Sequence, residues 1–157
     1  FRRVLFRSAL LSLSMAKDLE SAVARAAPAL AEAGLSQAVL LDASKAVAKP
    51  LYSWSTAAGG TTVQKDGLQT FVTPGLAPAL ARQFAGWTAL DDATREQNLK
   101  PFAAWTGGEH QLRVAAVPLK GERQLVVIAS WKAKTIDDAA VQAAALEMIR
   151  KLAGKLP

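Results

Sequence analysis

Near the C-terminal end, two extended runs flank a tight reversal and lead directly into a long helical segment. Residues 111–119 and 124–131 are rich in valine and other residues typical of β-strands, and Gly121 lies between them. This arrangement predicts an antiparallel hairpin. The alanine-rich run that follows begins at Ile136, ends at Leu152 and predicts a helix. A hairpin that passes into a helix indicates a domain of mixed α and β structure.

Both ends of the chain carry helical signals. Residues 15–33 place apolar side chains at spacings of three and four, and Gly34 suits the position just past a helix end. Because Pro28 lies inside this pattern, we expect either a kink or two short helices. At the other end, Thr135 and Asp138 resemble a capping box at the start of the terminal helix.

The part of the chain between these helices predicts additional hairpins. Residues 37–41 and 47–55 are extended in character and flank turn-forming residues, which predicts a hairpin. Residues 61–64 and 68–72 flank an Asp-Gly turn and predict a second hairpin.

Two short helices are expected before the last hairpin. Residues 76–87 carry apolar side chains at helical spacing, and residues 91–100 form a polar segment that ends before Pro101. The complete order predicts an α+β fold. In this fold an antiparallel sheet has one face covered by the N-terminal and C-terminal helices.

This order and two stretches of sequence resemble the GAF family. Residues 113–119, which read Arg-Val-Ala-Ala-Val-Pro-Leu, and residues 125–129 are similar to the family's last hairpin with its Val-Pro-Leu element. The helix after Asp138 resembles the closing helix of the family, and residues 38–42 resemble its first strand. We therefore expect residues 15–157 to form one GAF-like domain. A profilin-like, PAS-like or roadblock-like sheet is the alternative.

The resemblance implies a regulatory or sensory domain that binds a small molecule or dimerises, usually within a longer signalling protein. The Asn-Lys-Phe-Asp-Glu signature of the cyclic-nucleotide-binding members is absent, and the chain has no cysteine for bilin attachment or for methionine sulfoxide reductase chemistry. The ligand and any cofactor therefore stay unassigned. The alternatives are a ligand-free structural module that dimerises and a small enzyme of unrecognised chemistry.

The first eight residues, FRRVLFRS, resemble the translation of a sequencing adapter, which implies a gene assembled from environmental DNA. We therefore interpret residues 1–8 as an artefact and residues 9–14 as uncertain upstream sequence, with Met15 as a candidate initiator. Without the three arginines of this segment the net charge falls from +6 to +3, so a nucleic-acid-binding surface is not indicated. A secretory signal is the alternative interpretation, because arginines precede an apolar run.

Length and composition indicate one domain inside the cell. A chain of 157 residues is long enough for one domain with a core and short for two. It has no cysteine, which excludes disulfides and thiolate metal sites. No uncharged apolar run reaches the roughly 18 residues of a membrane span. We expect a cytoplasmic protein that binds neither membranes nor nucleic acid.

Large aromatic side chains favour a ligand site. Tryptophan rings can stack on a flat ligand and donate a hydrogen bond to its edge. We expect a pocket between the sheet and residues 76–110, where the resemblance implies a cavity. Its expected lining residues are Trp54, Phe84, Trp87, Trp105, His110 and Arg113. The alternative is that such rings fill the core of an alanine-rich domain, particularly Trp54 and Trp131.

His110 is the only histidine and follows two glycines, so a surface loop is the alternative to a functional role. One imidazole serves as an acid, a base or a ligand, but does not form a tight metal site alone. The sequence contains neither a Gly-x-Ser-x-Gly nucleophile elbow nor a phosphate-binding loop. We therefore expect a non-enzymatic domain without a metal.

The terminal helix predicts a surface for a partner. Its apolar residues form two adjacent stripes, which are wide enough to cover the sheet and leave a seam for another helix. We expect a homodimer through this helix. The stripes are Ile136, Ala140, Ala143 and Ile149, and Val141, Ala145, Met148 and Leu152.

Overall fold

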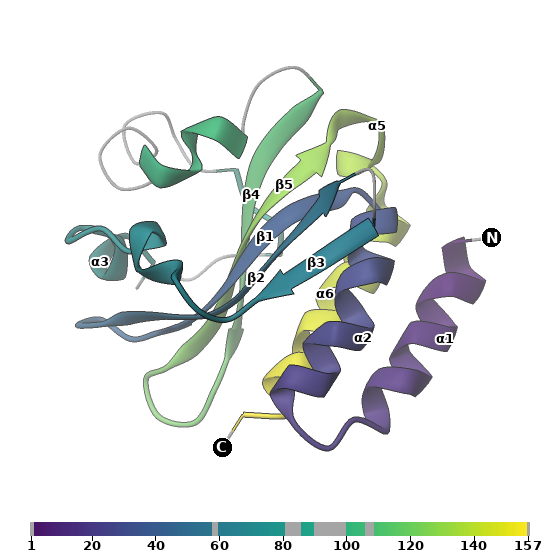
Figure 1. Cartoon of the computed structure of the whole chain (residues 1–157), viewed down its shortest axis with the longest axis horizontal. Coiled ribbons are helices and arrows are strands. Elements are labelled where there is room, and N and C mark those ends of the chain that lie inside the picture. Colours follow the sequence, from purple (N-terminus) through teal and green to yellow (C-terminus); the bar gives the residue numbers. More distant parts are fainter. Residues whose placement is uncertain (1, 58–59, 81–85, 90–99, 106–108, 157) are drawn as a thin grey trace.

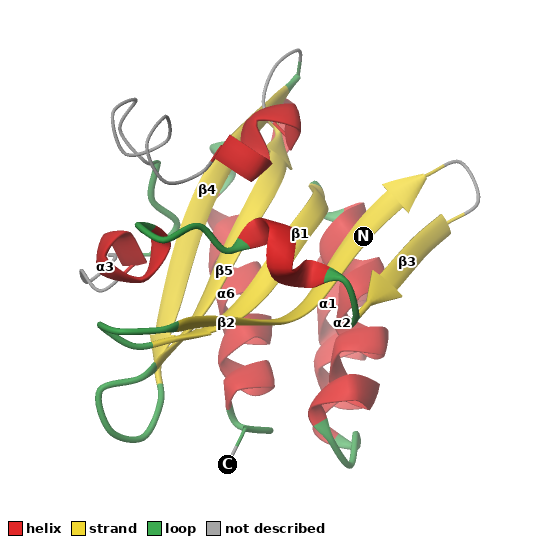
Figure 2. Cartoon of the chain, turned by 60° about the vertical axis from the view of Figure 1, so that its left-hand side comes forward, coloured by secondary structure: helices red, strands yellow, loops and turns green. Residues whose placement is uncertain are grey.

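The computed structural model describes residues 2–57, 60–80, 86–89, 100–105 and 109–156. Within this part of the chain, five strands form one sheet with helices on both of its faces (Figure 1; Figure 2). Three longer helices lie along one face and short helical segments lie on the other. In chain order the elements are α1 (Arg2–Ser14), α2 (Leu19–Glu32), β1 (Leu35–Ala43), β2 (Ala48–Ala57), β3 (Gly60–Gln64), η1 (Leu68–Phe71), α3 (Leu76–Leu80), η2 (Lys100–Trp105), β4 (His110–Pro118), β5 (Gln124–Lys132), α5 (Ala133–Ile136) and α6 (Ala139–Ala153).

The sheet has the strand order β3-β2-β1-β5-β4, and every neighbouring pair is antiparallel. The hairpins β1–β2 and β4–β5 confirm two of the predictions from the sequence, and the α+β class is also confirmed. Thr88 adds a short bridge on the outer side of β4. Its backbone exchanges hydrogen bonds of 2.8 and 2.9 Å with Val114, so the chain passes along this edge of the sheet.

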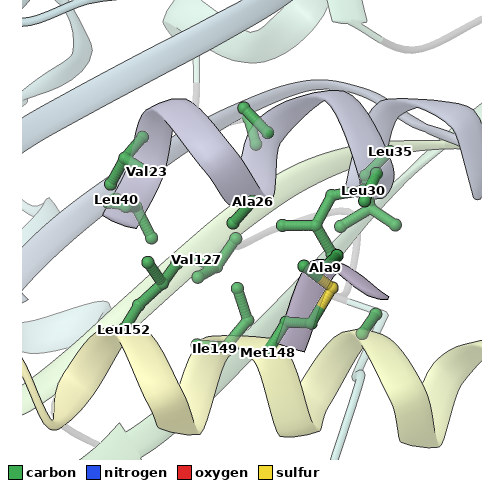
Figure 3. Packing of buried hydrophobic residues seen from close by; sticks show 14 of the residues in the cluster. Ala9, Val23, Ala26, Leu30, Leu35, Leu40, Val127, Met148, Ile149 and Leu152 are labelled. Carbon is green, nitrogen blue, oxygen red and sulfur yellow. The ribbon is translucent and has the colours of Figure 1, made fainter. Parts of the chain in front are cut away.

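The helix face of the sheet carries the larger core. α2 and α6 pack on the strands, and α1 contacts both helices. Figure 3 shows side chains of α2 and α6 converging on Leu40 and Val127 of the sheet. One predicted stripe of the terminal helix forms part of this core, since Val141, Ala145, Met148 and Leu152 are all buried. In α1, Phe6, Ala9 and Leu13 are buried against the same cluster. The interpretation of residues 1–8 and 9–14 stays a prediction.

α2 begins later than its periodicity indicates because a side chain caps it. The Asp18 carboxylate accepts a 2.8 Å hydrogen bond from the Ser21 backbone N–H, which lowers the pKa of this carboxyl, and the helix begins at Leu19. Pro28 lies inside a single helix, so the expectation of two short helices is wrong. Burial of the alanines around Pro28, together with Val23 and Leu30, offsets the backbone hydrogen bond that proline removes.

The predicted second hairpin differs from the structure. β3 pairs with β2, and residues 68–71, expected to be a strand, form the 3-10 helix η1. Gly67 takes a left-handed conformation, with φ of 70°, and turns the chain away from β3. Leu68 is then buried and η1 contacts β2, so burial of this apolar side chain favours the helical conformation of the segment.

The terminal helix also begins later than expected. Asp138 caps α6 by accepting hydrogen bonds from the Ala140 and Val141 N–H groups at 3.0 and 3.2 Å. The expected capping box is therefore wrong. Thr135 lies in the short helix α5, where its buried hydroxyl donates to the Lys132 carbonyl at 3.1 Å.

The opposite face of the sheet carries a second, smaller core. Its centre consists of apolar side chains from β1, β4 and β5, and η1, α3 and η2 cover it. α3 confirms the start of the helix predicted over 76–87, but residues 86–87 are not helical and Gly86 has φ of 68°, so the predicted end at Trp87 is wrong. The helix predicted over 91–100 falls almost entirely outside the described residues. Pro101 lies inside η2 instead of ending a helix. The buried residues of this core are Val39, Leu41, Ala43, Ala48, Leu76, Ala77, Leu80, Phe102, Leu112, Val114, Val126 and Ile128.

Candidate functional site

The predicted lining residues are divided between the two faces of the sheet. Trp54 is 1% exposed in the helix-face core, and its Nε1–H donates to the Leu35 carbonyl at 3.1 Å. Trp87 packs edge-on against Trp131, with ring centroids 5.2 Å apart, and donates to the Gln142 carbonyl of α6 at 3.1 Å. These rings occupy the core, as the alternative interpretation expected for Trp54 and Trp131.

Trp105 and His110 lie together on the opposite side of the sheet. Both line a hollow of about 400 Å³ at the end of the sheet where β1 and β4 begin and β2 and β5 end. We call it the Trp105 hollow, and its described lining residues are Ser36, Gln37, Thr56, Ala104, Trp105, His110, Ser130 and Lys132.

The two remaining predicted residues do not contribute to the described lining. Phe84 lies outside the described residues. Arg113 is on β4, but its guanidinium donates to the Gln111 side chain at 2.9 Å and to the Leu112 carbonyl at 3.0 Å. Because side chains alternate along a strand, Arg113 and His110 point to opposite faces of the sheet.

An aromatic cluster holds the Trp105 ring. Its centroid lies 5.3 Å from that of Phe71 in η1 and 5.0 Å from that of Phe102 in η2. Phe71 and Phe102 also stack on each other at 5.3 Å. Trp105 remains half-buried, so part of its surface is open to solvent. The cluster therefore presents an aromatic wall supported from behind.

A hydrogen bond ties this wall to the sheet. Ser130 is 1% exposed, and its hydroxyl donates to the Trp105 carbonyl at 2.7 Å. The end of η2 is thereby fixed over β5. The Ser130 oxygen keeps lone pairs that can accept a further hydrogen bond.

Strand register explains why the hollow is polar. Ser130 of β5 pairs with Gln37 of β1 on one side and with Leu112 of β4 on the other. Lys132 pairs with His110 one step farther along the strands. The same face is apolar along most of its length and becomes polar at this end. The sheet thus places amide, hydroxyl, imidazole and ammonium groups around one cavity.

The described lining consists of hydrogen-bonding groups, one indole ring and one lysine. Lys132 is exposed and is the single permanently charged residue among the described lining residues, none of which is acidic. In the described part of the chain, no three His, Asp or Glu side chains gather into a potential metal site. The lining offers donors, acceptors and one cation next to an indole ring, a combination typical of small-molecule sites.

Two other hollows lie on the helix side. A groove of about 830 Å³ runs between α1 and α6, lined mainly by apolar residues that include Leu10, Leu11 and Val141. The other, of about 420 Å³, contains Tyr52 and Glu20. Burial raises the pKa of Tyr52, and the negative charge of Glu20 raises it further.

Gln37, Ser130 and Lys132 are absent from the predicted set. β5 ends in Ala-Ser-Trp-Lys, where apolar and polar residues alternate. This provides a signal for Ser130 and Lys132, because both share a face with Ile128. The position of Gln37 depends on the pairing of β1 with β5, which joins segments about 90 residues apart in the chain. Local sequence patterns contain no signal for such a pairing.

Comparisons with protein-family models, with curated proteins and with solved structures yielded no match. Within the described residues, none of the helices has the length and apolar character needed to cross a membrane.

Proposed function

We propose that this chain is a regulatory, GAF-like domain that binds a small molecule in the Trp105 hollow. The observation that carries the proposal is the convergence of an aromatic wall and four kinds of polar side chain on a cavity of about 400 Å³. This volume falls in the range of roughly 300–1,000 Å³ typical of ligand pockets. The resemblance to the GAF family in the last hairpin and closing helix supports the same function.

The division of the molecule also supports a sensory function. The helix face carries the larger apolar core, whereas the Trp105 hollow lies on the face covered by short segments. A ligand that contacts both Trp105 and the sheet links η2 to β5, since Ser130 already joins these elements. Ligand binding would therefore stabilise the packing of η2 on the sheet.

A thermal-shift screen tests this proposal. The full chain is heated with nucleotides, haem and aromatic metabolites, and a ligand that binds the native state raises the melting temperature by mass action. Trp105→Ala should abolish the shift. Lys120→Ala, in the exposed turn at the far end of the sheet, should retain it. A panel that leaves the melting temperature of the unaltered chain unchanged would contradict the proposal.

We also propose that the chain forms a homodimer through α6. In the other predicted stripe of this helix, Ala140 and Ala143 are exposed and Ile149 is buried, while the Ile136 side chain lies outside the described part. Ala140 lines the groove between α1 and α6. Its small side chain permits close approach of a second helix, and Leu11 on the other side of the groove is 65% exposed.

Light scattering at high micromolar concentration tests the dimer. We expect a dimer for the unaltered chain and a monomer for Ala140→Glu, which places a charge in the groove. Ala139→Glu is the matched control because residue 139 is exposed in the same helical turn and does not line the groove. A monomer for the unaltered chain would contradict dimerisation and would leave the ligand proposal unaffected.

A further inference from the structure

We infer that the Trp105 hollow selects a small aromatic acid, that is, a flat ring that carries a single carboxylate. This inference rests on the proposed function and names the chemical class of its ligand. Three properties of the described lining support the inference. The Trp105 indole is held by neighbouring rings, Lys132 is the single permanent charge, and the polar side chains come from strand positions that pair with one another.

The ring requirement follows from Trp105. Phe71 and Phe102 hold the indole from η1 and η2, so a ligand ring that stacks on it costs little side-chain ordering. The neighbouring lining residues are small or polar, namely Ala104, Ser36 and Thr56. A flat ring therefore finds its principal apolar contact on Trp105.

The charge requirement follows from Lys132. Its ammonium group is the single permanent charge among the described lining residues, and Lys134, which is also exposed, is not one of them. A bound carboxylate gains a charge-assisted hydrogen bond from Lys132. One lysine balances a monoanion and leaves half the charge of a phosphate dianion uncompensated.

Strand pairing supplies the remaining hydrogen bonds. His110 is the cross-strand partner of Lys132, and Gln37 is the partner of Ser130. The imidazole and the amide can each donate a hydrogen bond to the second carboxylate oxygen or to a ring substituent. Acidic ligands are favoured because the described lining has donors on four strands and no carboxylate to repel them.

The experiment compares three probes of related shape. 2-Naphthoate carries one negative charge, 2-naphthamide is its neutral counterpart, and 2-naphthyl phosphate carries nearly two negative charges. Binding is measured by calorimetry and by the NMR signal of the Trp105 indole N–H, assigned with Trp105→Phe. We expect 2-naphthoate to bind about tenfold more tightly than the amide, as one charge-assisted hydrogen bond provides. 2-Naphthyl phosphate should bind less tightly than 2-naphthoate.

Two lysine variants test whether Lys132 causes the tighter binding of 2-naphthoate relative to 2-naphthamide. Lys132→Gln should reduce the affinity for 2-naphthoate to that of the amide while leaving amide binding unchanged. Lys134→Gln removes a nearby exposed charge that does not line the hollow and should preserve the preference. Melting temperatures of both variants verify that they are folded.

The outcomes separate this inference from the proposed function. Equal affinities for 2-naphthoate and 2-naphthamide, or a preference that survives Lys132→Gln, would overturn the aromatic-acid inference and leave a ligand pocket. Tighter binding of 2-naphthyl phosphate would assign the site to a phosphate ligand instead. If no probe shifts the Trp105 signal while another compound of the thermal-shift panel does, the aromatic-acid inference fails and the proposed function stands.

Discussion

The two faces of the sheet are built from the same strands and yet differ in how they are covered. On the helix face, α2 and α6 run along the sheet and α1 packs over them, so the core is a continuous apolar layer. On the other face, η1, α3 and η2 are short and cover a smaller core that ends in a polar hollow. Strand alternation supplies both faces, whereas the longer helices bury the larger of the two apolar cores.

This contrast associates stability with one face and binding with the other. A long helix buries a whole stripe of side chains against the strands, and its packed layer relaxes little. A short helix fixes only a few contacts, so the space beside it stays open to solvent and ligands. The four predictions that follow test whether the two faces differ in this way.

The largest effect is expected from a pair of adjacent leucines on β1. Leu40 faces the helix layer, Leu41 faces the short segments, and both are 0% exposed. Replacement of either by alanine removes the same atoms. We expect Leu40→Ala to lower the free energy of unfolding by about 4 kcal/mol and Leu41→Ala by about 3 kcal/mol, because the helix layer is less able to close the cavity. Urea unfolding measures both, and an equal or reversed order would contradict the comparison.

The second prediction concerns Gly34, which lies in the connection between α2 and β1. Gly34 has φ of 121°, and a Cβ at this position collides with the Thr135 hydroxyl. Gly34→Ala should therefore cost about 3 kcal/mol, the sum of backbone strain and steric overlap. Gly121, in the open β4–β5 turn, also has positive φ but has no atom within 4 Å of such a Cβ.

Gly121→Ala should therefore cost only about 1 kcal/mol, from backbone strain alone. Thr135→Ala combined with Gly34→Ala should recover part of the stability that Gly34→Ala loses. Thermal unfolding measures all three proteins. If the two glycine variants lose equal stability, the packing around Gly34 is not what restricts this position.

Substitution of two tryptophans, Trp131 and Trp105, should affect stability less than the leucine substitutions do. Trp131 is 0% exposed in the helix-face core, and its Nε1 has no hydrogen-bond partner among the described residues. Trp131→Phe should cost about 2 kcal/mol through the cavity it leaves, with no hydrogen bond lost. Trp105→Phe should cost less than about 1 kcal/mol because the ring is half-buried.

For ligand binding the order should reverse. Trp105→Phe should weaken 2-naphthoate binding, and Trp131→Phe should leave it unchanged, because Trp131 lies on the other face. Calorimetry on both variants measures this. Loss of binding in Trp131→Phe without unfolding would show that the two faces are coupled.

The smallest effect concerns the titration of Tyr52. Burial raises the pKa of this phenol above its ordinary value of about 10, and Glu20 adds to the rise. A raised pKa in the folded state means that the unfolded chain releases the phenol proton at a lower pH than the folded chain. The contribution to stability is therefore present below the ordinary pKa and is lost as the pH rises through the folded pKa.

Tyr52 is the only tyrosine, so tyrosinate absorbance reports on it alone. Glu20→Gln should move the titration midpoint down toward the ordinary value. Glu32→Gln, at the far end of α2, should leave the midpoint in place. An unchanged midpoint in Glu20→Gln would mean that Glu20 does not contribute to the raised pKa of Tyr52.

Several elements could be predicted because their signals are local. The β4–β5 hairpin follows from valine-rich runs around Gly121, and the buried stripe of α6 follows from its period. Other predictions failed where a tertiary contact outweighed the local pattern. Residues 68–71 are extended in character, but burial of Leu68 next to the left-handed Gly67 produces a 3-10 helix.

The amino-acid sequence by itself determined which side chains alternate along each strand and which line up along each helix, because these depend on neighbours only a few residues away. The tertiary structure decided that β1 pairs with β5, which brings Gln37 to Ser130. It also decided that Trp54 and Trp87 enter the helix-face core while Trp105 lines the hollow. The physical reason is that contacts between distant segments depend on the packing of the whole chain, which no local pattern specifies.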